Sequence, residues 1–140
     1  MEIRIGSSSD YLIIKDIVPE GQVFGYDPRS IDFLRGTIQL QMTEMSSNIG
    51  ASFMLGELRQ FLTDLQKLYD TLKYSFVFKN LEDNIELNFT PTPNGQIQIN
   101  GILRNSEYTG SIKFKIETDQ SYLPGTIGNL KDLFHEMKIG

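Results

Sequence analysis

The chain has 140 residues, a formal net charge of −5 and no cysteine. This length fits one domain spanning residues 1–140, and a hydrophobic share of 39% can supply its core. The composition excludes disulfides and cysteine zinc sites, and no apolar run approaches the roughly 20 residues of a membrane-spanning helix.

The N-terminal residues MEIRIGSSSD lack the basic start and apolar middle of a signal peptide. We therefore expect a cytoplasmic protein with no membrane partner. Nucleic-acid binding depends on neutralising phosphates, so an acidic chain without a basic run predicts no nucleic-acid partner. The acidity has two explanations that composition leaves open: solubility alone, or an electrostatic match to a basic partner.

The N-terminal third predicts a hairpin followed by a long connection. Ile3 and Ile5 begin an alternating segment that stops at the turn formers of residues 6–10. Residues 11–18 are rich in β-branched side chains and predict the returning strand. Residues 19–31 contain Gly21, Gly25 and Pro28 with little periodicity, which is typical of an irregular connection.

The next segment predicts a second hairpin that leads into the first helix. Ile38, Leu40 and Met42 alternate with polar residues, as in a strand buried on one side. We expect a turn at residues 46–48 and a returning strand that ends near Leu55. The helix is predicted over residues 56–73, with Gly56 as its N-cap. Its apolar stripe has steps of three and four: Leu58, Phe61, Leu62, Leu65, Leu68, Tyr69 and Leu72.

Period-two alternation returns after the helix and predicts four strands, within residues 74–78, 85–89, 97–103 and 112–116. The turns between them lie at residues 81–84, at Asn94-Gly95 and at residues 105–110. A second helix is predicted near residues 123–137, with Asp119 or Ser121 as its cap and Pro124 in its first turn.

These elements predict an α+β fold with two layers. We expect a mainly antiparallel sheet of about six to eight strands, with two amphipathic helices covering one face. The other face would be a polar surface rich in amides, formed by Thr37, Gln39, Gln41, Asn88, Gln96, Gln98, Lys113 and Lys115.

The sequence contains no recognisable catalytic set. His135 is the single histidine, and no serine and carboxylate nearby suggest a triad. Glu82-Asp83 and the pair Asp16 and Glu20 are candidate acids, but acids in turns usually face water. We expect no enzyme activity, no catalytic residue, no metal site and no cofactor. The run DQSYLP at residues 119–124 indicates a helix cap with an aromatic anchor, or alternatively a contact patch.

The order of motifs resembles the WapI-like family of bacterial immunity proteins. The helix pattern EL..F...L..LY..L ends at Leu72, and it is followed by LEDNIEL at residues 81–87 and NGQIQING at residues 94–101. DQSYL follows at residues 119–123. The resemblance covers residues 33–137 and leaves the first 32 residues unmatched.

The resemblance implies a cytoplasmic immunity protein, similar to an antitoxin, that binds the C-terminal toxic domain of a cognate polymorphic toxin, often a nuclease. A nuclease domain is usually basic, so the acidity of this chain fits such a partner. We expect the contacts at Glu20, Asp27 and Asp32 in the connection, or at Gln39, Gln41, Gln96 and Gln98 on the polar face. A module that binds a small molecule or peptide without catalysis is the alternative.

Overall fold

The computed structural model describes residues 1–20 and 33–137. Within these ranges the chain forms eight strands, a short 3-10 helix and two α-helices. Their bounds, in chain order, are β1 (Ile3–Gly6), β2 (Tyr11–Pro19), β3 (Phe33–Met42), β4 (Met45–Met54), α1 (Leu55–Thr71), β5 (Phe76–Lys79), β6 (Ile85–Pro91), β7 (Gln96–Arg104), β8 (Ser111–Asp119), η2 (Gln120–Tyr122) and α2 (Leu123–Glu136).

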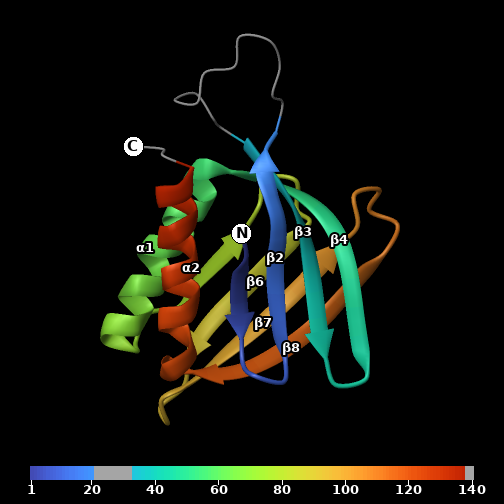
Figure 1. Ribbon diagram of the computed structural model, residues 1–140. Coiled ribbons are helices and arrows are strands. Elements are labelled where there is room, and N and C mark those ends of the chain that lie inside the picture. Colours follow the sequence, from blue (N-terminus) through green and yellow to red (C-terminus); the bar gives the residue numbers. More distant parts are fainter. Residues whose placement is uncertain (21–32, 138–140) are drawn as a thin grey trace.

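The predicted α+β class, with antiparallel strands and two helices, is confirmed. The strands are divided between two four-stranded sheets, with the orders β1-β2-β3-β4 and β5-β6-β7-β8. Every neighbouring pair is antiparallel. Figure 1 shows the strands of one sheet crossing behind those of the other, with both helices together at one side.

The apolar rows of both sheets meet in one hydrophobic core. The ring of Phe61 of α1 stacks on Phe78 of β5 at 4.1 Å between centroids. Phe78 in turn stacks on Phe53 of β4 at 6.1 Å. Offset aromatic stacking adds stability beyond the burial of apolar area, so these rings help to hold the helix and both sheets together.

The first helix begins earlier than predicted. Its N-cap is Met54, and Gly56 lies inside the first turn, so the assignment of Gly56 as the cap is wrong. The physical reason is Glu57, whose carboxylate accepts a hydrogen bond from the Met54 N–H at 2.7 Å. This bond satisfies a donor that the helix itself leaves free.

The second helix covers the outer edge of β1. Asn129 accepts a hydrogen bond from the Arg4 N–H at 3.0 Å, and the Thr126 hydroxyl donates to the Arg4 carbonyl. Pro124 lies in the first turn of α2, as predicted. Asp119 caps η2 rather than α2, whose N-cap is Tyr122, so the prediction of Asp119 or Ser121 as the cap of α2 is wrong. Side chains of α2 therefore cover the outer edge of β1.

The turn between β3 and β4 differs from the prediction. It lies at Thr43 and Glu44 rather than at residues 46–48, and Met42 pairs with Met45. Glu44 has a φ of 67°, and Asp10 accepts a hydrogen bond from the Thr43 N–H at 3.2 Å. The predicted Asn94-Gly95 turn is confirmed, with a φ of 79° at Gly95.

Neither helix in the described part of the chain has the length and apolar character needed to cross a lipid bilayer.

Candidate functional site

A hollow of about 400 Å³ lies where turns from the second sheet approach β2, β3 and β4 of the first sheet. Asp16, Val18, Arg35 and Ser52 line it from β2, β3 and β4. Glu82 and Asn84 line it from the turn between β5 and β6, and Ser106 lines it from the turn between β7 and β8. We call this region the loop-end hollow. Because both sheets contribute to it, a partner bound there would contact residues of both sheets.

A bulge in β2 places Asp16 at the hollow. The pairing of β2 with β3 shifts register between Lys15 and Val18, and Asp16 has a φ of 55°. Gly36 lies opposite the bulge, and a Cβ added there would lie 3.1 Å from the Lys15 carbonyl oxygen. Bulges re-aim side chains, and here the bulge leaves the Asp16 carboxylate exposed at the rim.

Two buried asparagines fix the β5–β6 turn. The Asn80 side chain accepts hydrogen bonds from the backbone N–H groups of Asn84 and Ile85, at 2.8 and 3.2 Å. Its amide group donates to the Ser52 carbonyl at 3.0 Å. The Asn84 amide group donates to the Arg104 carbonyl at 3.1 Å. These bonds join the turn to β4 on one side and to β7 on the other.

The two turns expose large apolar side chains beside their acids. Leu81 is 71% exposed, and Tyr108 is 58% exposed. Tyr108 has a φ of 58°, which is strained for a bulky residue. Its hydroxyl donates to the Glu82 carbonyl and so joins the two turns. Backbone strain that persists beside an exposed aromatic ring is a feature found more often at functional surfaces.

The charged residues around the hollow are of both signs. Asp16, Glu82 and Arg35 line it, and the Arg104 guanidinium donates to the Asp83 carbonyl at 3.2 Å. Asp16, Glu82 and Asp83 are exposed, and no base in the described residues forms an ion pair with them. Burial raises the pKa of the nearby Glu57 carboxyl, and the negative charge of Glu82 acts in the same direction. Hydrogen bonds from the backbone of Met54 and Leu81 partly offset this rise in the pKa. The acids Asp16, Glu82 and Asp83 outnumber the bases Arg35 and Arg104 by one charge, so the local field favours a cationic partner only slightly.

The structure separates the residues that the sequence proposed as contacts. Glu20 lies exposed at the end of β2, and its N–H donates to the Phe33 carbonyl at 3.0 Å. Asp27 and Asp32 fall outside the described residues. Glu20 follows Val18, which lines the loop-end hollow, by two residues. The end of β2 therefore lies near the hollow.

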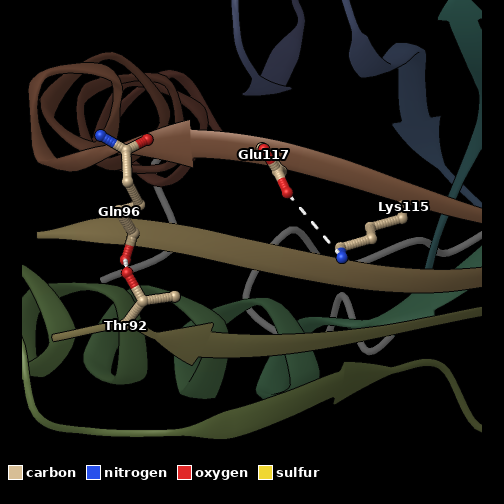
Figure 2. A network of polar contacts seen from close by, with 4 residues as sticks. All are labelled: Thr92, Gln96, Lys115 and Glu117. Carbon is tan, nitrogen blue, oxygen red and sulfur yellow. Dashed lines mark hydrogen bonds and ion pairs between the residues drawn. The ribbon is translucent and has the colours of Figure 1, made fainter. Parts of the chain in front are cut away.

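The predicted amides lie on two different sheets. Gln39 and Gln41 are in β3, whereas Gln96 and Gln98 are in β7. Near Gln96 the Thr92 hydroxyl donates to the Gln96 carbonyl at 3.3 Å, and Lys115 pairs with Glu117 at 3.8 Å (Figure 2). The structure thus brings the amides together in pairs and does not unite them in one face.

Metal binding and histidine chemistry find little support in the described residues. They contain no group of three or more histidine, aspartate or glutamate side chains that could hold a metal ion. His135 is exposed in the last turn of α2. The sequence interpretation missed Leu81 and Tyr108, and the only available signal was a large apolar residue within each predicted turn.

Comparison with protein families decides the identification. Residues 16–138 match the model of the Immunity protein WapI-like family. The chain belongs to this family. The match confirms the resemblance carried by the helix pattern, LEDNIEL and DQSYL, and it extends the resemblance toward the N-terminus to include the bulge at Asp16. No curated protein matches the chain.

Solved structures of other proteins share the fold. The plant transcriptional regulator PBF-2 matches at a TM-score of 0.55 and 11% identity, covering 99% of this chain and 82% of that one. WHY1 from Arabidopsis thaliana matches at 0.51 and 16% identity, over 100% and 91% of the two chains. Trypanosome MRP1/MRP2 matches at 0.50 and 12%, over 99% and 84%. At these identities the likeness concerns the fold alone.

Proposed function

We propose that this immunity-family chain binds and neutralises the C-terminal toxic domain of a cognate polymorphic toxin, and that this domain is a basic nuclease. Membership of the Immunity protein WapI-like family over residues 16–138 carries the proposal. We propose further that the protein acts in the cytoplasm of the bacterium that makes the toxin, by binding and without catalysis.

The loop-end hollow supports a protein partner. Asp16 and Glu82 line it together with Arg35, and the turns beside it expose Asp83, Leu81 and Tyr108. Apolar and aromatic anchors supply most of the affinity of protein interfaces, and charge complementarity accelerates encounter and sets orientation. A basic protein surface fits this combination better than a small anion does.

The position of the loop-end hollow makes it a better candidate for the toxin contact than the two pairs of glutamines. Gln39 and Gln41 lie on a different sheet from Gln96 and Gln98, whereas both sheets contribute to the hollow. We therefore place the main contact at Glu82 and Asp83, with Glu20 at its margin. Asp27 and Asp32 stay predicted contacts, and so do the four glutamines.

Co-expression tests this function. The toxic domain is the C-terminal region encoded by the gene immediately upstream, and it is produced in bacterial cells with or without this chain. We expect arrested growth without the chain and restored growth with it. Incubation of the purified domain with tRNA or DNA should show cleavage that the chain suppresses. Failure to restore growth, together with no complex on size-exclusion chromatography, contradicts the function.

A further inference from the structure

The outer edge of β4 is the one sheet edge in the described part of the chain that lacks evident protection. The edge of β1 is paired with Asn129 and Thr126 of α2. β5 has only four residues. β8 has Lys113, Lys115 and Glu117 along its outward face, and it lies beside β1. Natural sheets commonly protect their edges by such coverage, short length and charge.

β4 is neither short nor charged, and among the described residues a side chain bonds to its outer edge only at Ser52, from Asn80. It is ten residues long, with the sequence MSSNIGASFM, which contains no charged residue and no proline. Its pairing with β3 is regular along its whole length, without a bulge. In Figure 1 it forms the outer margin of its sheet. A long, uncharged and regular edge is a template for a further strand.

The direction of the free backbone groups follows from one hydrogen bond. The Ser52 carbonyl accepts from the Asn80 side chain and therefore points away from β3. In an antiparallel ladder every second residue has the same orientation. The N–H and C=O groups of Ser46, Asn48 and Gly50 therefore also point outward. All three residues are exposed, and no described backbone group outside the β3–β4 ladder bonds to them.

Two hollows adjoin this edge, at neighbouring stretches of β4. A hollow of about 330 Å³ separates Ile49 of β4 from Leu103 and Ile112 of the second sheet. The loop-end hollow adjoins the other end of the edge, at Gly50 and Ser52, and contains Glu82. Side chains of a strand alternate between faces. A strand added to β4 could thus place an apolar side chain against Ile49 and Ile112, and a basic one beside Glu82.

We propose that an extended basic segment of the toxin domain adds to β4 as a fifth strand of the first sheet. This inference rests on the proposed function and specifies how the toxin is held. A second copy of this chain fits the edge less well. Antiparallel self-pairing would bring Glu82 of one copy toward Glu44 of the other, between molecules that each have a net charge of −5.

Amide hydrogen exchange tests the proposal residue by residue. The N–H groups of Asn48 and Gly50 should exchange rapidly in the free protein, while Ser47 and Ile49 are already bonded to β3. With the toxin domain at 100 times its Kd, exchange at Asn48 and Gly50 should slow about 100-fold. A complex that leaves both amides in rapid exchange overturns the proposal and leaves the proposed function intact.

A matched pair of variants gives an independent test. Nothing lies within 4 Å of a Cβ added at Gly50, so Gly50→Ala keeps the outward N–H with little disturbance. Gly50→Pro removes that donor, which β3 does not use, and it also restricts φ at residue 50. We expect Gly50→Pro to weaken toxin binding at least about tenfold and Gly50→Ala less than about twofold. Equal affinities in two folded variants overturn the proposal.

The oligomeric state of the free protein tests whether a second copy of the chain occupies the β4 edge. Sedimentation of the free protein should show a monomer. A dimer in which Asn48 and Gly50 are protected would show that a second copy occupies the edge, and it would overturn the proposal. Absence of any complex with the toxin domain would overturn the proposal and the proposed function together.

Discussion

The amide group of Asn80 donates to the Ser52 carbonyl at 3.0 Å and so joins the β5–β6 turn to the outer edge of β4. Asn80 is 1% exposed and has no free side-chain atom. Its carbonyl oxygen also accepts from the N–H groups of Asn84 and Ile85. One buried side chain thus positions Glu82 beside the exposed edge of the first sheet.

Asn80→Ala is expected to destabilise the protein strongly. The change leaves the buried N–H groups of Asn84 and Ile85 without an acceptor. We expect a loss of about 2–3 kcal/mol in the free energy of unfolding, measured by urea denaturation. Asn100→Ala, at an exposed position in β7, is the control and should change it by less than about 0.5 kcal/mol. Equal effects of the two substitutions would contradict this role for Asn80.

Gly101→Ala is expected to disturb the packing of the second sheet. A Cβ at Gly101 would lie 2.2 Å from Cζ of Phe114, whose ring covers the glycine from the paired strand. Overpacking of this kind costs about 1–3 kcal/mol. The double variant Gly101→Ala with Phe114→Leu should be less destabilised than the sum of the single changes. Thermal unfolding of all four proteins gives the coupling, and strict additivity would contradict the contact.

Asp119 provides a prediction about pH. The side chain and backbone N–H of Ser121 donate to its carboxylate, and these hydrogen bonds lower the pKa of Asp119 below its usual 3.8. A lowered pKa in the folded state adds stability above pH 3.8 that is lost as the pH falls through the folded pKa. Asp119→Asn should therefore unfold at a lower temperature than wild type at pH 7, and the difference should shrink below pH 3.8. A constant difference between pH 2 and pH 7 would contradict this cause.

The acids of the β5–β6 turn are expected to govern toxin binding. Glu82→Lys with Asp83→Lys should weaken binding at least about tenfold at low salt, and the loss should diminish as salt rises. Isothermal titration at two ionic strengths measures both effects. Asp132→Lys with Glu136→Lys changes exposed acids of α2 by the same total charge and serves as the control. If both pairs weaken binding equally, net charge rather than this turn is responsible.

Periodicity identified the elements because it reports on the solvent exposure of each residue. The alternation through Ile38 and Leu40 predicted β3, and the helical stripe through Phe61 and Leu65 predicted α1. Alternation does not specify which strands are neighbours, since a buried row looks the same in either sheet. The division into two sheets therefore emerged only from the structure.

Errors arose where distant residues decide the local structure. The Thr43–Glu44 turn is bonded by Asp10, more than thirty residues earlier in the chain, so the polar residues 46–48 gave a misleading turn signal. The candidate site likewise depends on residues that are distant in the sequence. Glu82 and Tyr108 belong to separate turns, and their contact depends on the pairing of β6 with β7, which no local pattern specifies.

The most direct measurement is titration of the purified chain into the purified C-terminal domain of the upstream toxin. We expect a one-to-one complex with a Kd below about 1 μM, and loss of the nuclease activity proposed for the toxin at the same ratio. Absence of binding heat, with nuclease activity unchanged by an excess of folded chain, would contradict the proposed function.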